Sequence, residues 1–132
     1  MTYLFDTNAW LRLAERPETI SPAARLRLDE VVGAFPLSVV SIWEVGLKAR
    51  KGKLQLTLPL DDWLAEMTRP AFVRLLPVDA AIARLSNTLP GNFHDDPADR
   101  FIVATAIKHN LTIVTSDQLI LAYPHVKTLD TR

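Results

Sequence analysis

Short apolar runs recur along the chain, and a segment with helical spacing of its apolar residues follows nearly every one. The runs are continuously apolar, whereas a half-exposed strand alternates apolar and polar positions. Strands buried on both faces are typical of parallel sheets covered by helices. We therefore expect an α/β fold, with three α/β/α layers and a central parallel sheet of four to five strands. The predicted strands are residues 2–5, 35–40, 72–76, 111–115 and an edge strand at 126–129.

Helix starts are predicted where a capping residue type precedes apolar residues at helical spacing. Ser21 is the clearest, because proline follows it at the favoured first helical position. In that helix we expect Leu26, Leu28, Val31 and Val32 to make apolar contacts. The predicted helices are 8–16, 22–33, 41–51, 60–67, one capped by Asp79, one from Asp96 and Pro97 to near His109, and 116–123.

The composition limits the classes of function. The chain has 132 residues, of which 48% are apolar, so we expect one domain spanning 1–132. Its 15 basic and 15 acidic residues balance, so a nucleic-acid partner would need a local basic surface. The absence of cysteine excludes disulfides, thiolate metal sites and a cysteine nucleophile. No apolar run approaches the roughly 20 residues that span a bilayer, and we expect a cytoplasmic protein without membrane contact.

Carboxylates fall where predicted strands end or helices begin. Asp6 directly follows the first strand, and Asp117 lies two residues beyond the strand that ends at Thr115. Glu44 and Asp99 are predicted in the first turns of two helices. Because the loops and helix starts of an open parallel sheet converge at the carboxyl edge of its strands, we expect these acids at one edge.

Each acid also has an ordinary structural explanation. Ser41 and Glu44 have the spacing of a capping box. Asp96 is a suitable N-cap, and Asp99 three residues later suits the positive end of the helix dipole. The acids after the strands can cap the helices that follow them. Taken singly, no acid distinguishes a cap from a site.

The four acids together are harder to explain as caps. Carboxylates on one narrow edge repel one another and raise one another's pKa unless a cation compensates them. Mg²⁺ and Mn²⁺ prefer carboxylate and water oxygens and often share substrate phosphate. One ion can activate a water for in-line attack on phosphorus, and a second can stabilise the leaving oxygen. The pattern therefore indicates metal-dependent phosphodiester hydrolysis.

The chain resembles the PIN-domain nucleases and, among them, the VapC-type toxins of bacterial toxin–antitoxin modules. The resemblance spans nearly the whole chain and depends on the order and spacing of four short segments, 6–9, 41–48, 94–104 and 114–117. It implies an α/β/α fold and an Mg²⁺- or Mn²⁺-dependent endoribonuclease that acts on RNA. It also implies a cognate antitoxin protein as partner and a homodimer that uses the early helices.

The resemblance assigns roles to individual residues. The implied catalytic and metal-binding acids are Asp6, Glu44, Asp99 and Asp117. The side chains implied to orient carboxylates or water are Thr7, Asn8, Asp96, Thr115 and Ser116. Asp95, Asp96 and Asp99 compete as the third acid, and Asp99 is favoured because Arg100 follows it, as in the family. Ala98 stands where the family often has an aromatic residue, which affects a wall of the substrate groove.

Basic residues gather after the segment that carries Glu44. Lys48, Arg50 and Lys51, with Lys53, are candidates for RNA phosphate contact, although cations also suit a helix C-terminus. Arg100 is expected either to meet phosphate or to pair with a neighbouring acid. The three histidines lack ligand-like spacing, so we expect structural or surface roles for them.

Two other interpretations compete with the nuclease. An aspartate-based phosphotransfer domain also gathers acids at a sheet edge. A phosphatase of that kind would have a second aspartate at Asn8, and a receiver would have a lysine just after a late strand, where Ser116 and Asp117 follow Thr115. A catalytically inactive PIN-like RNA- or protein-binding module is the third interpretation. The presence of all four acids weighs against it.

Overall fold

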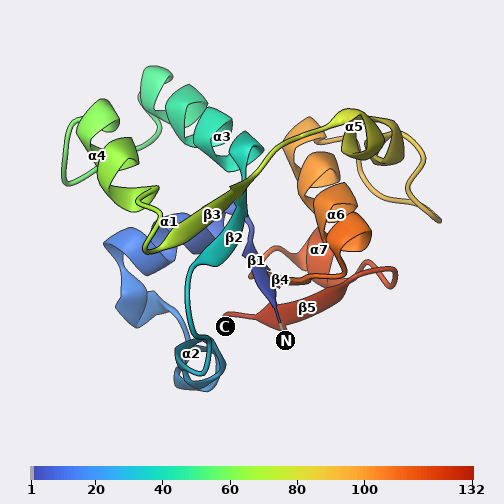
Figure 1. The fold of residues 1–132 in the computed structure, drawn as a ribbon, viewed down its shortest axis with the longest axis horizontal. Helices are drawn as coiled ribbons and strands as arrows, with labels where there is room; N and C mark the ends of the chain where they lie inside the picture. Colours follow the sequence, from blue (N-terminus) through green and yellow to red (C-terminus); the bar gives the residue numbers. More distant parts are fainter. Residues whose placement is uncertain (1) are drawn as a thin grey trace.

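Strands alternate with helices along nearly the whole chain in the computed structural model, which describes residues 2–132 (Figure 1). The strands are β1 (Tyr3–Phe5), β2 (Phe35–Ser38), β3 (Val73–Leu76), β4 (Thr112–Thr115) and β5 (Lys127–Asp130). The α-helices are α1 (Thr7–Glu15), α2 (Pro22–Asp29), α3 (Val39–Arg50), α4 (Leu60–Met67), α5 (Ala80–Ser86), α6 (Pro97–His109) and α7 (Gln118–Leu121). A short 3₁₀ helix, η1 (Pro17–Thr19), follows α1.

All of the strand pairs are parallel, as predicted, but they form two hydrogen-bonded sheets and not one. One sheet has the order β1-β4-β5, and the other pairs β2 with β3. β2 lies alongside β1 and continues the central layer (Figure 1). Pro36 in β2 has no amide hydrogen to donate, so β2 lacks one ladder donor on the side that this residue faces. The five predicted strands are therefore all present, with the hydrogen bonding interrupted at the middle.

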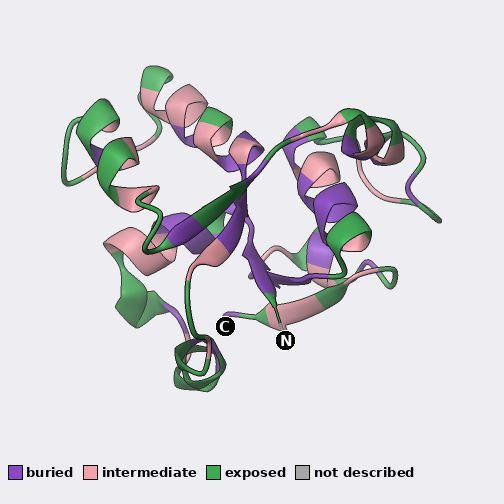
Figure 2. Cartoon of the chain, viewed as in Figure 1, coloured by how far each residue is buried: buried purple, intermediate pink, exposed green. Residues whose placement is uncertain are grey.

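Apolar side chains pack on both faces of the sheet, because successive strand residues point to opposite faces. Leu4 and Ile113 pack with residues of α5, α6 and α7. Tyr3, Phe5 and Val114 pack with residues of α1, α3 and α4 on the opposite face. The buried colour in Figure 2 accordingly follows the central strands and the inner faces of the flanking helices. This confirms the predicted three-layer α/β/α arrangement.

Helix α3 begins earlier than the sequence predicted. Its N-cap is Ser38, whose hydroxyl accepts the amide of Val40 at 3.1 Å, and the first helical residue is Val39. Ser41 is fully buried inside the helix and is not its cap. Glu44 therefore lies in the second turn, and the capping-box interpretation of Ser41 and Glu44 is wrong.

Helix α2 has the predicted start but only part of the predicted contacts, because Leu28 is buried and Val31 packs against the core while two other apolar residues are not covered. Ser21 caps it, accepting the amide of Ala24 at 3.2 Å, and Pro22 is its first residue. Leu26 is 66% exposed, and Val32, beyond the end of the helix, is 97% exposed. Both were predicted to make apolar contacts, and neither is covered. Within residues 2–132, no helix is long and apolar enough to cross a membrane.

Candidate active site

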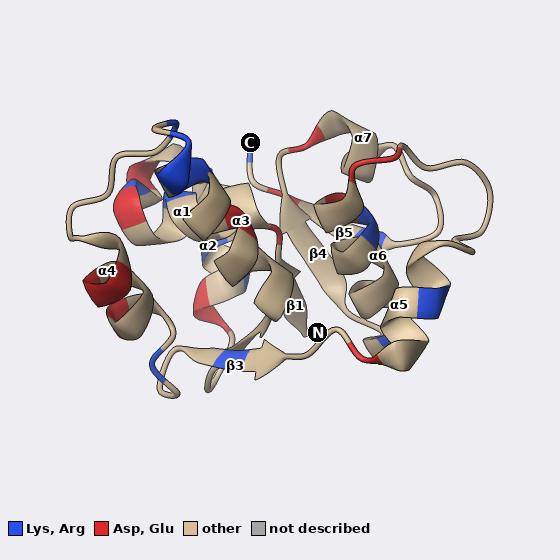
Figure 3. Ribbon diagram, turned by 90° about the horizontal axis from the view of Figure 1, so that it is seen from above, with Lys and Arg blue, Asp and Glu red and all other residues tan. Residues whose placement is uncertain are grey.

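The predicted acids come together at the carboxyl edge of the sheet. Asp6 follows β1 and Asp117 follows β4, while Glu44 and Asp99 reach the edge from α3 and α6. Figure 3 is seen from above Figure 1 and shows acidic segments at α3 and at the starts of α6 and α7. Parallel pairing of β1 with β4 places the residues after the two strands side by side. Segments far apart in the sequence therefore form one acidic surface.

Asp6 is both a helix cap and a buried acid. One carboxylate oxygen accepts the amide of Ala9 at 2.8 Å, and the other accepts the hydroxyl of Thr115. The Thr115 hydroxyl in turn accepts the amide of Asp117 at 2.9 Å, so its single proton is directed at Asp6. The side chain is only 4% exposed, which a cap does not require. Burial raises the pKa of Asp6, and the charges of Asp117 and Glu44 raise it further against these two hydrogen bonds.

Glu44 is held by a threonine from another helix. Thr7, in the first turn of α1, donates its hydroxyl to one carboxylate oxygen of Glu44. The hydroxyl of Ser41 lies 3.0 Å from that of Thr7 and is hydrogen-bonded to it. Thr7 and Ser41 are both buried, whereas Glu44 is partly exposed. Two buried hydroxyls thus fix one oxygen of Glu44, and among the described residues its second oxygen accepts no hydrogen bond.

Asp99 also has a raised pKa. Burial raises its pKa to about 7, helped by the charges of Asp96, Asp117, Glu44 and Asp6 in that order. A position in the first turn of a helix favours the anion, so the neighbouring acids and burial outweigh the helix dipole. The pKa of Asp99 therefore reports that acids from all the predicted segments lie within electrostatic range of one another.

The three candidates for the third acid have different environments. Asp95 is exposed. Asp96 is also exposed and caps α6, accepting the amide of Asp99 at 3.2 Å. The Asp99 side chain is 19% exposed, and one of its oxygens lies 3.1 Å from Nε2 of His94 without hydrogen-bond geometry. Because Nδ1 of His94 accepts the amide of Asp96 at 3.3 Å, the ring carries its proton on Nε2, facing Asp99.

Asp117 keeps a capping role as well. One of its oxygens accepts the amides of Leu119 at 2.8 Å and Ile120 at 3.1 Å, at the start of α7. The carboxylate is partly exposed at the acidic edge. The predicted cap and the predicted site position therefore coincide in one residue, as they do for Asp6.

The acids fit an open metal site better than a closed one. Within residues 2–132, no three acidic or histidine side chains are close enough to form a preassembled ligand set. Mg²⁺ keeps several waters and binds through one or two carboxylates with substrate phosphate, so it does not require such a set. The like charges that raise the pKa of Asp6 and Asp99 are the charges that a bound cation would compensate. The donor chemistry fits a hard divalent cation.

Several other predicted residues take different partners. Asn8 is exposed, and its side-chain oxygen accepts Nζ of Lys48 at 2.8 Å, where orientation of a carboxylate was predicted. Arg100 forms no ion pair among the described residues. Its guanidinium donates to the carbonyl oxygens of Ser86 at 2.7 Å, Phe93 at 2.8 Å and His94 at 3.1 Å. The predicted pairing of Arg100 with an acid is wrong, because the loop before α6 uses its donors.

The sequence interpretation missed residues that the fold brings to this edge. Ser41 supports Thr7, but it could be read only as a helix cap. His94 approaches Asp99, and its short separation from Asp99 along the chain was the available signal. Arg12 and Arg16 lie beside Lys48 in a pocket, although they are distant from it in sequence. Arg50 and Lys51 do not line that pocket, and Ser116 is partly exposed next to Asp117.

Comparisons with known proteins give a consistent family. The family model of the PIN domain matches residues 3–125. Ribonuclease VapC22 of Mycobacterium tuberculosis (strain ATCC 25618 / H37Rv) is 29% identical over 124 residues, which cover 94% of this chain and 93% of that protein. VapBC2 from Rickettsia felis, bound to a DNA fragment from its promoter, has a TM-score of 0.71 at 17% identity, covering 100% of both chains. FitAcB from Neisseria gonorrhoeae has a TM-score of 0.69 at 24% identity, covering 98% of each chain.

Proposed function

Because the chain belongs to the PIN domain family, we propose that it is a metal-dependent endoribonuclease that acts as the toxin of a type II toxin–antitoxin module. The similarity to a protein named Ribonuclease VapC22 supports the RNA substrate. The neighbouring folds include VapBC assemblies, which supports an antitoxin partner. Catalysis and metal binding are assigned to Asp6, Glu44, Asp99 and Asp117 in one domain spanning 1–132.

The observation that carries this proposal is the coupling among the acids. The pKa of Asp99 is raised to about 7 by burial and by acids from β1, α3, α6 and the β4–α7 loop. A helix cap benefits from full ionisation, whereas this acid is held half-protonated near neutral pH unless a cation is present. Glu44 has no capping role at all, because it lies in the second turn of α3. A role in helix capping or in the first turn of a helix therefore does not explain Asp99 or Glu44, two of the four acids.

The surrounding side chains fix the orientation of the acids before substrate arrives. Thr115 holds Asp6, and Thr7 with Ser41 holds Glu44. Each of these carboxylates keeps oxygen lone pairs that these hydrogen bonds do not use. Preorganised acids of this kind need no rearrangement when charge develops at the reacting phosphate.

Mg²⁺ or Mn²⁺, when bound by these acids, would supply positive charge for the phosphate and a more acidic water. Water then loses one proton and its oxygen attacks phosphorus in line, the bond from phosphorus to the leaving oxygen breaks, and the leaving oxygen takes up one proton. Without a cation the pKa of Asp99 is raised to about 7, so binding of the cation would favour the ionised form of this acid.

The partner predictions are retained as parts of the proposal. The cognate antitoxin would neutralise the toxin by direct binding. A homodimer through the early helices would cover Leu26 and Val32, which are 66% and 97% exposed. The chain would act in the cytoplasm.

Expression in a bacterial host tests the proposal as a whole. New RNA 5′ ends should appear and growth should stop when the chain is expressed alone. Co-expression with the small gene that adjoins its own should abolish both effects. Growth arrest without new RNA ends would refute the ribonuclease activity, and cleavage unaffected by the neighbouring gene product would refute the antitoxin partner.

A further inference from the structure

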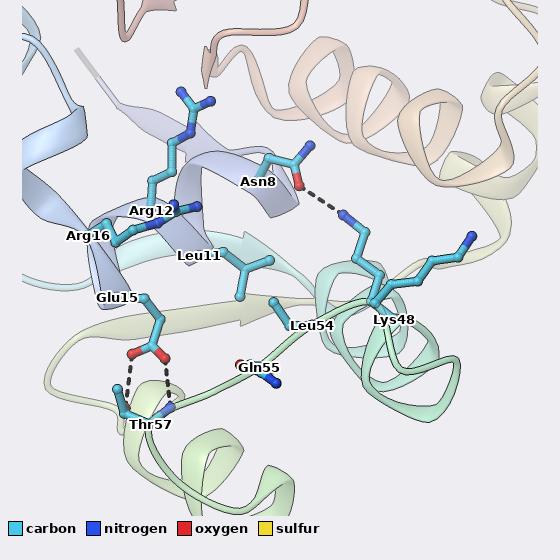
Figure 4. Close-up of a pocket in the computed structure, with 10 residues that line it drawn as sticks. Asn8, Leu11, Arg12, Glu15, Arg16, Lys48, Leu54, Gln55 and Thr57 are labelled. Carbon is cyan, nitrogen blue, oxygen red and sulfur yellow. Dashed lines mark hydrogen bonds between the residues drawn. The ribbon is translucent and has the colours of Figure 1, made fainter.

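A cavity of about 610 Å³ opens beside the acidic edge, between α1 and the segment after α3 (Figure 4). Its walls come from α1, from Lys48 on α3 and from the connector that leads to α4. Leu11 and Leu54 form its apolar part, and Glu15 is tied to the hydroxyl and amide of Thr57 at 3.0 and 2.9 Å. This contact between Glu15 and Thr57 shapes one wall of the cavity without using its cationic side chains.

The charge of the cavity contrasts with that of the whole chain. The chain has no net charge, yet the lining includes four cations and one acid, Arg12, Arg16, Lys48, Lys53 and Glu15. Within residues 2–132, Arg12, Arg16 and Lys53 have no side-chain hydrogen bond or ion pair, while Lys48 is bound only to the neutral Asn8. Three free cations around one cavity are a binding surface for an anion with several charges.

The cavity continues directly from the carboxylates along two helices. Asp6 caps α1, and Asn8 and Arg12 follow on that helix one turn apart. Lys48 lies one turn after Glu44 on α3. The hydrogen bond between Asn8 and Lys48 at 2.8 Å joins the two helices where the acids end and the cations begin. A chain-like anion that crosses the acids would thus enter the cavity.

We propose that this cavity is a subsite for the sugar–phosphate backbone of single-stranded RNA. The part of the strand that it binds lies outside the acids that hold the scissile bond. The proposal rests on the ribonuclease function proposed above. Arg12 and Arg16 present guanidinium groups suited to phosphate oxygens, and the lysines add point charges. These contacts position the strand without reading its sequence. An acidic protein segment would match the charge but not the continuity with a phosphodiester-cleaving edge.

A matched pair of double variants tests the subsite. The pocket variant carries Arg12→Gln and Lys53→Gln, and the control carries Arg84→Gln and Lys127→Gln, which remove the same charge from exposed positions outside the cavity. Both are made in the full chain with Asp99→Asn to limit cleavage. Binding of labelled random-sequence single-stranded RNA is measured by anisotropy in Mg²⁺ over a range of salt concentrations.

The pocket variant should lose about tenfold in RNA affinity, and the slope of log affinity against log salt should shrink by about 1.4, roughly 0.7 for each lost phosphate contact. The control should lose less affinity and keep the slope of its parent. Equal losses in both variants, or an unchanged slope in the pocket variant, would overturn the proposal. Unchanged RNA binding with lost binding of a polyglutamate peptide would overturn it in favour of an acidic protein segment.

The subsite and the ribonuclease can fail separately. If the chain with its native acids cleaves RNA while the pocket and control variants bind RNA alike, only the subsite is wrong. If that chain binds RNA through the cavity but cuts no RNA with Mg²⁺ or Mn²⁺, only the ribonuclease is wrong.

Discussion

Asp99 combines two environments that act on its charge in opposite directions. The start of α6 favours the anion, while burial and four neighbouring acids favour the protonated form. The second influence is larger, because the pKa is raised to about 7. Asp99 therefore destabilises the metal-free protein at neutral pH, which is the cost of an assembled acidic site.

Replacing Asp99 with asparagine should change how stability depends on pH. The pKa of Asp99 lies near 3.9 in the unfolded chain and is about 7 in the folded one. Protonation of Asp99 therefore adds fully to the free energy of unfolding below about pH 3.9, and this contribution is lost as the pH rises through 7. In chelator, the Asp99→Asn protein should gain about 1–2 kcal/mol over the parent between about pH 5 and pH 8, after allowance for partial solvation. Urea unfolding at several pH values measures this gain. A stability difference independent of pH would contradict the shifted pKa.

The choice of the third acid can be tested at the same helix start. Asp96→Ala should lower the free energy of unfolding by about 1 kcal/mol, because α6 loses its cap, while metal-dependent cleavage persists. Asp99→Ala should abolish cleavage while the fold remains. Chemical denaturation and an RNA cleavage assay on both proteins separate the two roles. Full cleavage by the Asp99→Ala protein would show that the third acid is assigned wrongly.

At the scale of elements, local chemistry predicted those helices whose first residues carry an unambiguous cap. Ser21, Asp79 and Asp96 cap α2, α5 and α6 as expected. Helix α3 was misplaced because Ser38 and Ser41 are both acceptable caps, and burial of Ser41 against α1 decides between them. Thr7 and Ser41 are 34 positions apart in the sequence, so the spacing of neighbouring residues cannot predict their contact. The same limit hid Arg12 and Arg16, which join Lys48 only in the fold.

Strand β4 offers a test of how the site is supported. Thr115→Val should lower the free energy of unfolding by about 1–3 kcal/mol and reduce cleavage, because Asp6 and the amide of Asp117 each lose a buried partner. Thr112→Val is the matched control on the same strand, since the Thr112 hydroxyl is buried without a hydrogen-bond partner. That change should be neutral or stabilising. Equal destabilisation by both substitutions, with equal activity, would contradict the role given to Thr115.

At the scale of the whole molecule, two patterns of apolar residues were sufficient to predict a parallel α/β/α fold. These are the helical spacing in the helices and the continuous apolar runs in the strands. They could not reveal the interruption between β1 and β2, because strand pairing depends on long-range hydrogen bonds. They also could not reveal which apolar residues stay uncovered. Leu26 on α2 and Val32 beyond its end both lie on the outside of the molecule.

Those exposed residues bear on the proposed homodimer. Light scattering should give twice the 14.8 kDa chain mass for the parent protein and the single-chain mass for a Leu26→Ser, Val32→Ser variant. Exposed polar substitutions on a monomer change stability by less than about 0.5 kcal/mol, so an unfolded variant is not expected. A monomeric parent, or a variant that remains dimeric, would contradict this contact.

The most direct test of the central claim is cleavage of RNA by the purified chain, with and without divalent cations. New RNA ends should appear with Mg²⁺ or Mn²⁺, disappear in chelator and return when the cation is restored. The Asp6→Asn and Asp99→Asn proteins should remain folded and lose at least about 10²-fold in rate, as expected when a group that holds the reacting charges is removed. Cleavage that persists in chelator, or that survives in both variants, would contradict an active centre built from these carboxylates.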